Sequence, residues 1–205
     1  MTNLGNRGVR EQSLMEIMKA KPDVVLFSGD KLFGGPQAGI AVGTKEAIRK
    51  MGEHPLSRAL RLEKMTLAAL EGTLIDYLDM KSSIKMNPTL HMITVEKDEL
   101  RLRAEHLKDM LTKANGENEE LTFSVTEVED KIGGGAAPDA VLSGYGVVVT
   151  SDKTPIMTLE KELRLSSVPI ITRIRENALV ISVRTLLKGD EEAILCAFKE
   201  RLKTC

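Results

Sequence analysis

Lys31 is the residue with the clearest chemical potential, because it lies in the glycine-rich segment Ser28-Gly-Asp-Lys-Leu-Phe-Gly-Gly-Pro-Gln-Ala-Gly39. This segment directly follows Asp23–Phe27, an apolar and β-branched run that is typical of a buried strand. The end of a buried strand is an unusual place for a purely solvated charge. A lysine amine becomes a nucleophile toward carbonyl carbon when desolvation or a neighbouring charge lowers its pKa.

The neighbours of Lys31 suit the binding of pyridoxal phosphate, a cofactor whose aldehyde condenses with lysine amines. Ser28 offers a hydroxyl for the cofactor phosphate, and Asp30 can hold a proton or orient a substrate group. Gly34 and Gly35 permit positive φ angles and a close approach of the backbone to a ligand. These residue types make Lys31 a candidate for covalent attachment of the cofactor.

The same loop has a simpler interpretation, which is a surface turn that carries a solvated lysine. The spacing from Ser28 to Lys31 also occurs in penicillin-recognising enzymes, but these need Ser-Asp-Asn and Lys-Thr-Gly segments that the sequence lacks. A phosphate-binding P-loop requires Gly-Lys-Ser/Thr, which is also absent. The cofactor lysine and the surface turn therefore remain as the two alternatives.

Arg58 and Arg61 form a second candidate site, which would bind a tetrahedral anion. The leucines of residues 56–80 recur at three- and four-residue steps or their sums, and this spacing predicts one long helix. Residues three apart share a helix face, so both guanidinium groups can converge on one anion, and Lys64 extends that face. The alternative is a solvated, basic helix surface.

The rest of the sequence predicts an α/β protein in which strands alternate with helices. Helices are expected over residues 9–20, 44–51, 98–113, 159–165 and 190–203. Strands are expected over residues 23–27, 38–42, 89–95, 121–128, 146–150, 170–174 and 178–183. The expected domains are the edge of a larger domain over 1–55, a linking helix over 56–84, and a small C-terminal α/β domain over 85–205.

The composition is that of an ordinary globular protein, with 42% hydrophobic and 29% charged residues among 205. A formal net charge of −1 disfavours a nucleic-acid-binding surface spread over the whole chain. No segment is apolar enough for a signal peptide or a membrane helix, so we expect a cytoplasmic protein. Cys196 and Cys205 lack partners at metal-ligand spacing, and we expect neither catalysis nor metal binding from them.

The segment Ser28–Gly39 resembles the lysine motif of the L-seryl-tRNA(Sec) selenium transferase (selenocysteine synthase) family. The similarity continues, in the family's order, through His54-Pro-Leu-Ser-Arg-Ala-Leu-Arg-Leu-Glu-Lys64, Leu67-Ala-Ala-Leu-Glu71, Gly133-Gly-Gly-Ala136, Pro169-Ile-Ile-Thr-Arg-Ile174 and Val183-Arg-Thr-Leu186. These segments span most of residues 23–200. The resemblance implies a fold-type I enzyme that depends on pyridoxal phosphate, with this chain as the edge of its large domain, a linking helix and its small domain.

The resemblance also implies roles for individual residues. Lys31 matches the family's Schiff-base lysine, Asp30 its neighbouring active-site aspartate, and Arg58 and Arg61 its arginines at the selenophosphate site. The implied reaction converts seryl-tRNA(Sec) to selenocysteinyl-tRNA(Sec), and the implied assembly is a dimer or a ring of dimers. By analogy with fold-type I enzymes Arg173 is a candidate for binding a substrate carboxylate, although a surface position on a strand explains it equally well.

Family members are longer than this chain, and the similarity begins shortly before the strand that precedes Lys31. We expect the residues that pair with the pyridine nitrogen, stack on its ring and surround its phosphate to lie upstream, together with the tRNA-binding module. The chain alone is therefore expected to give no turnover. Two other functions stay open: a non-catalytic subunit for oligomerisation or regulation, and a pyridoxal-phosphate lyase that acts on a small amino acid.

Overall fold

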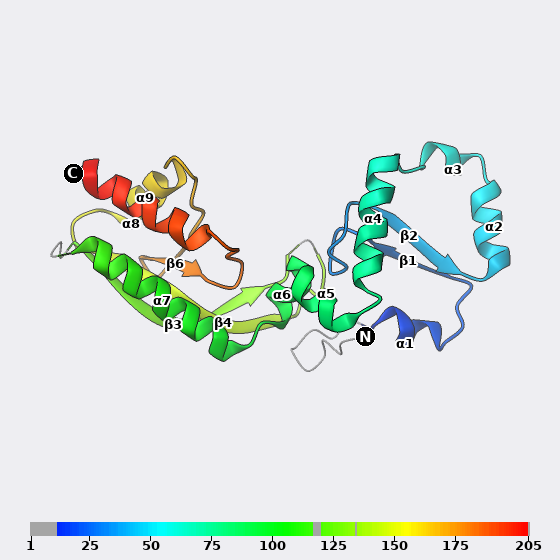
Figure 1. Cartoon of the computed structure of the whole chain (residues 1–205), viewed down its shortest axis with the longest axis horizontal. Helices are drawn as coiled ribbons and strands as arrows, with labels where there is room; N and C mark the ends of the chain where they lie inside the picture. The colour runs from blue at the N-terminus through cyan, green and yellow to red at the C-terminus, as the bar shows by residue number, and fades with distance from the viewer. Residues whose placement is uncertain (1–11, 117–119, 134, 205) are drawn as a thin grey trace. The chain divides into compact units, whose positions relative to one another are not determined.

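The computed structural model describes residues 12–116, 120–133 and 135–204, which divide into two compact units (Figure 1). The first unit contains the described chain up to Thr94 together with Lys131–Leu142. The second unit contains Val95–Asp130 and the chain from Ser143 onward. Each unit has a hydrophobic cluster of its own, and the cluster of the second unit is the larger.

The first unit contains a two-stranded antiparallel sheet of β1 (Val24–Ser28) and β2 (Gly39–Gly43). Phe27 lies opposite Ile40 and Val25 opposite Val42, so these side chains share one face of the sheet. The two strands predicted on either side of the lysine loop are confirmed. The prediction that the first strand is buried is wrong, because Leu26 on the opposite face is 69% exposed.

Short helices flank this sheet in the sequence. Helix α1 (Leu14–Met18) begins at a capping box, in which Ser13 and Glu16 each accept a hydrogen bond from the backbone N–H of the other. Helix α2 (Lys45–Glu53) begins after Thr44, whose hydroxyl accepts from the Ala47 N–H. Both helices were expected, although α1 is shorter than its hydrophobic pattern suggests, and residues 9–11 of that prediction lie outside the described residues.

The single long helix predicted over residues 56–80 is wrong, because three helices occupy this region: α3 (Leu56–Ala59), α4 (Lys64–Asp76) and α5 (Met80–Met86). The Glu63 carboxylate starts α4 by accepting hydrogen bonds from the Met65 and Thr66 N–H groups at 2.7 and 2.5 Å. Asp79 starts α5 by accepting from the Lys81 N–H at 3.1 Å. The leucine spacing crosses the first break and ends at Leu78 within the second, so periodicity alone does not reveal these carboxylate caps.

The strand predicted over residues 89–95 is also wrong, since α6 (Pro88–Thr94) is a helix. The Asn87 side chain caps it by accepting a hydrogen bond from the Leu90 N–H at 3.2 Å, and Pro88 takes the first helical position, where its missing N–H costs nothing. Ile93 then packs into the hydrophobic cluster of the first unit, together with Ala140 and Leu142.

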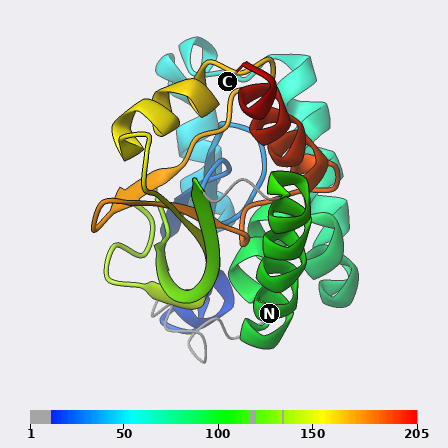
Figure 2. The same ribbon diagram turned by 90° about the vertical axis from the view of Figure 1, so that its left-hand side faces the viewer.

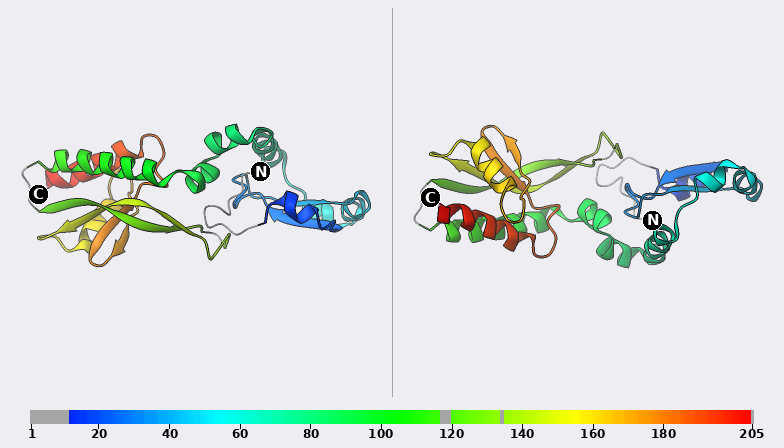
Figure 3. Two further views of the ribbon diagram at one scale, coloured as in Figure 1. Left: turned by 90° about the horizontal axis from the view of Figure 1, so that it is seen from below. Right: turned by 90° about the horizontal axis from the view of Figure 1, so that it is seen from above.

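The second unit is a four-stranded sheet of order β3-β4-β6-β5, formed by β3 (Leu121–Lys131), β4 (Val141–Ser151), β6 (Ala178–Ser182) and β5 (Arg173–Arg175). Strand β6 is antiparallel to both of its neighbours. Helices α7 (Lys97–Asn115) and α9 (Asp190–Thr204) lie side by side against one face of the sheet (Figures 2 and 3). The elements predicted for this part are confirmed in type.

The core of the second unit is formed where α7, α8 (Ile156–Arg164) and α9 meet the sheet. Its fully buried side chains come from all of these elements: Leu100, Leu107, Leu111, Val147, Val149, Leu159, Leu163, Leu179, Val183 and Phe198. The protein is therefore a mixed α/β chain. Among the described residues, no helix combines the length and apolar character needed to cross a membrane.

Candidate active site

The lysine loop is a closed turn at the end of β1. Its neck is held by the Gly29 N–H, which donates to the Ala38 carbonyl at 2.8 Å. Inside the loop, the Gly34 N–H donates to the Lys31 carbonyl at 2.9 Å and the Gly35 N–H to the Gly29 carbonyl at 2.7 Å. Lys31 is thus the first residue of a four-residue hydrogen-bonded turn that ends at Gly34.

The side chain of Lys31 is exposed, and it forms no ion pair or hydrogen bond with any described residue. Asp30 is also exposed, and Ser28 is half-buried at the last position of β1. The structure therefore brings the three predicted loop residues together on one short stretch of ordered backbone, and it leaves the Lys31 amine accessible to a ligand.

Phe33 is the residue through which this turn is attached to the rest of the first unit. Its ring stacks on Tyr77, with centroids 4.6 Å apart, and meets Phe27 edge to face at 5.9 Å. Its carbonyl oxygen accepts two hydrogen bonds, from the Tyr77 hydroxyl at 2.8 Å and from Asn87 Nδ2 at 3.0 Å. Partial burial raises the pKa of Tyr77 to about 12, so its hydroxyl remains a donor at neutral pH.

Asn87 also explains the glycine at position 34. Gly34 has a φ of +69°, and a Cβ there would lie 2.3 Å from Asn87 Oδ1. A side chain at position 34 is thus excluded by both the backbone conformation and the neighbouring amide. Sequence reasoning missed Tyr77 and Asn87 as residues of the site; the dipeptide Asn87-Pro88 indicated only the end of a helix.

Arg58 and Arg61 line an open hollow of about 530 Å³, together with Leu62, Glu63 and Lys64. The two arginines do not lie on one helix face as predicted, because α3 ends at Ala59 and Arg61 follows in a non-helical connection. The connection nevertheless places both side chains, and Lys64 at the start of α4, around the same hollow.

The charges of the lining favour an anion, because it contains three cationic side chains and one carboxylate. That carboxylate, Glu63, is occupied in capping α4: hydrogen bonds from the Met65 N–H, from the Thr66 hydroxyl and from the Thr66 N–H lower its pKa. Its negative charge is therefore directed partly toward the helix and not wholly into the hollow. Neither Lys31, Asp30 nor Ser28 belongs to the lining.

Arg173, a candidate for binding a carboxylate, is engaged within the second unit. Its guanidinium donates to Asp130 Oδ1 at 3.0 Å and to the Glu129 carbonyl at 3.1 Å. Asp130 is shared with the buried Arg184, whose Nε lies 2.9 Å from Oδ2. These bonds join β3 to β5 and to the segment after β6, which gives Arg173 a structural role in this unit.

The residues of the lysine loop fit a phosphorylated aldehyde cofactor in two respects. The Lys31 amine is accessible and has no competing partner among the described residues, and glycine is required at positions 29 and 34, where a Cβ would meet the Pro36 carbonyl oxygen and the Asn87 side chain. The described residues contain no cluster of three His, Cys, Asp or Glu side chains suited to a metal ion. Cys196 is a free, exposed thiol.

Comparison with known proteins identifies the fold and the family of this chain. The structure is similar to that of D-glucosaminate-6-phosphate ammonia-lyase, with a TM-score of 0.54 at 17% sequence identity. The superposed part covers 91% of this chain and 45% of the lyase, so the two share a fold over that part. Residues 1–187 match the L-seryl-tRNA selenium transferase family, SelA. This chain belongs to the SelA family.

The relatives at higher identity carry the same family name. The L-seryl-tRNA(Sec) selenium transferase of Clostridium perfringens strain 13 is 44% identical over 191 residues, which cover 93% of this chain and 41% of the relative. That of Clostridium botulinum strain Hall is 45% identical over 193 residues, covering 94% and 41%. The chain thus spans about two fifths of the length of the relatives that it matches.

Proposed function

We propose that this chain supplies the lysine loop and the anion-binding hollow of an L-seryl-tRNA(Sec) selenium transferase, which uses pyridoxal phosphate and selenophosphate to convert seryl-tRNA(Sec) to selenocysteinyl-tRNA(Sec). Membership of the SelA family supports this reaction. The observation that carries the proposal is the closed turn after β1, which presents the Lys31 amine without a partner among the described residues. We expect the enzyme to act in the cytoplasm as a homo-oligomer, either a dimer or a ring of dimers.

In this proposal the loop residues hold the cofactor and move protons. Pyridoxal phosphate, when bound, supplies an aldehyde for a lysine amine and a ring that draws electrons from the substrate. Lys31 attaches the cofactor through Nζ and accepts or returns a proton at that atom. Asp30 orients the reacting groups beside it, and the Ser28 hydroxyl donates a hydrogen bond to the cofactor phosphate.

Arg58 and Arg61 bind selenophosphate in the hollow between α3 and α4. A guanidinium group donates two parallel hydrogen bonds to a tetrahedral oxyanion, and Lys64 adds a third positive charge. We also propose residues 1–55 as the edge of a large cofactor-binding domain, residues 56–84 as a linking segment and residues 85–205 as a small domain, although residues 85–94 and 131–142 pack with the first compact unit.

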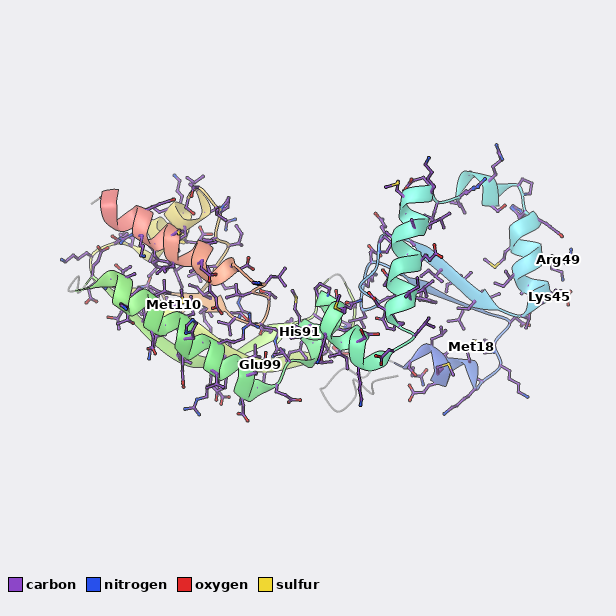
Figure 4. All side chains as sticks on the ribbon, viewed as in Figure 1. Met18, Lys45, Arg49, His91, Glu99 and Met110 are labelled. Carbon is purple, nitrogen blue, oxygen red and sulfur yellow. The ribbon has the colours of Figure 1, made fainter. Side chains whose placement is uncertain are left out.

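The experiment that tests the cofactor role combines the purified chain with pyridoxal phosphate, followed by borohydride reduction and peptide mass spectrometry. We expect the phosphopyridoxyl adduct at Lys31 in preference to Lys45, an exposed lysine of α2 (Figure 4). The Lys31→Ala variant should lose this adduct while Lys45→Ala retains it. Equal labelling of both lysines in the parent chain would remove the support for a cofactor lysine.

A second candidate function is a non-catalytic subunit that assembles with a longer chain of the family. The observation in its favour is the apolar surface of α4 and the following turn, where no α4 residue is buried. Its exposed apolar side chains are Met65, Leu67, Leu74, Ile75 and Leu78. Co-purification with a full-length family member, without a Lys31 adduct, would support this function over the first.

A further inference from the structure

Tyr77 and Asn87 converge on the lysine turn from two different helical segments. Tyr77 follows α4 and Asn87 lies between α5 and α6, yet both donate to the Phe33 carbonyl, two residues after Lys31. Asn87 Nδ2 also reaches the Gly34 carbonyl at 3.4 Å. Tyr77 and Asn87 thus hold one peptide group of the turn, although they lie 44 and 54 positions after Phe33 in the sequence.

The two side chains that donate these bonds differ in what holds them. Asn87 is only 4% exposed; its Oδ1 accepts from the Leu90 N–H at 3.2 Å, and its backbone N–H donates to the Ser83 carbonyl at 2.8 Å. Tyr77 stacks on Phe33 with an angle of 7° between the rings. Because Asn87 is ordered by contacts outside the turn, it loses little entropy when it donates to Phe33, and Tyr77 adds a ring contact to its own hydrogen bond.

The other side of the turn is also packed. Leu32, between Lys31 and Phe33, lies against the hydrophobic cluster of Ile93, Ala140 and Leu142. Leu32 therefore packs against an apolar cluster and Phe33 contacts two aromatic rings, while the Lys31 side chain is exposed. This arrangement fixes the backbone of Lys31, while its amine contacts none of the residues that the structure describes.

We infer that Tyr77 and Asn87 are positioning residues, which set the conformation of the Lys31 turn and thereby the position from which the Lys31 side chain extends. The role in catalysis rests on the proposed function, whereas the hold on the turn does not. Neither residue is expected to touch the cofactor, because both act on the Phe33 carbonyl and not on Lys31 itself.

Hydrogen–deuterium exchange of the full chain tests the hold on the turn. The Gly34 and Gly35 amides donate within the loop, so their exchange reports its opening. We expect exchange to accelerate about 5-fold in Tyr77→Phe, which loses one hydrogen bond, and about 20-fold in Tyr77→Leu, which also loses the ring stacking. Asn87→Asp keeps the helix-capping acceptor, lacks the donor, and should accelerate exchange about 10-fold.

The matched control is Tyr145→Phe, which removes the other tyrosine hydroxyl of the chain, one bonded to Glu127 in the second unit. It should leave Gly34 and Gly35 exchange unchanged. Labelling by pyridoxal phosphate and borohydride then measures the ratio of Lys31 to Lys45 adducts, which should fall toward 1 in Tyr77→Leu and Asn87→Asp. A variant that simply failed to fold would also show faster exchange in α2, which these variants should not.

Unchanged Gly34 and Gly35 exchange in both Tyr77→Leu and Asn87→Asp would overturn the inference. Faster exchange with an unchanged ratio of Lys31 to Lys45 adducts would also overturn it, because the turn would then not control the amine. If the parent chain shows no preference for Lys31 while the variants loosen the turn, the cofactor role fails and the hold on the turn stands.

Discussion

Gly34→Ala is the substitution for which the structure gives the most definite cost. Alanine at a φ of +69° costs about 1 kcal/mol in backbone strain. Its Cβ would also lie 2.3 Å from Asn87 Oδ1 and 2.5 Å from Nδ2, so the amide must move away. That movement breaks the bonds to the Phe33 carbonyl and the Leu90 N–H, at about 1 kcal/mol each. The free energy of unfolding of the first unit should therefore fall by about 3 kcal/mol.

Urea unfolding followed by tyrosine fluorescence measures this cost for the first unit alone. The chain has no tryptophan and two tyrosines, one in each unit, so a Tyr145→Phe background leaves Tyr77 as the sole reporter. Gly72→Ala is the matched control, because Gly72 lies inside α4 and a Cβ there meets nothing within 4 Å. That change should be neutral or stabilising by up to about 1 kcal/mol.

The reasoning would be refuted by a Gly34→Ala chain whose unfolding free energy lies within about 0.5 kcal/mol of its parent, the range of an ordinary surface change. It would fail equally if Gly72→Ala destabilised the chain as much as Gly34→Ala, since the cost would then not come from the contact with Asn87. A variant with an unchanged midpoint and a smaller slope would indicate altered compactness, and not the calculated loss of stability.

Three further predictions concern charge. Because burial raises the pKa of Tyr77 to about 12 while the unfolded chain ionises near 10, the first unit should lose stability between pH 10 and 12, and Tyr77→Phe should remove that loss in urea titrations. Hydrogen bonds from Arg201, then from Thr154, lower the pKa of the buried Glu120; Glu120→Gln should destabilise the second unit by roughly 3 kcal/mol at pH 7 in calorimetry. This difference should begin to shrink below the ordinary carboxyl pKa of about 4.5 and disappear only as the pH falls through the lowered pKa of the folded state. Replacing Arg58 and Arg61 by alanine should reduce selenophosphate-dependent turnover of the reconstituted enzyme at least about tenfold, whereas replacing the ion-paired Arg49 of α2 should not.

The helices of the second unit were predictable because the apolar residues that recur at helical spacing in the sequence are the residues that the fold buries. Leu100, Leu107 and Leu111 recur at helical spacing and are all buried in α7. In the first unit the same kind of pattern was misleading: the leucines of residues 56–80 suggested one helix, yet Leu60, Leu74 and Leu78 are exposed and the chain is interrupted twice. Spacing predicts a helix reliably when burial selects it, and less reliably when the apolar side chains face solvent.

The candidate site divides in the same way. Lys31, Asp30 and Ser28 are adjacent in sequence, so their proximity follows from chain connectivity once the strand and the glycines are recognised. Tyr77 and Asn87 reach the same turn through contacts of long sequence separation, which no local motif encodes. Arg58 and Arg61 were expected together for a reason that the structure corrects: a break after α3, and not a shared helix face, places them around one hollow.

The exposure of Lys31 indicates what else the proposed chemistry requires. Amine nucleophilicity in enzymes depends on desolvation or a neighbouring charge. Here the described residues order the Lys31 backbone through Phe33 but place no covering layer over its side chain. On helix α4, Thr73 lies near the lysine loop, whereas the apolar side chains of Leu67 and Leu74 are exposed. The described residues thus form a preformed turn, and the proposed chemistry would require a second protein surface over its reactive group.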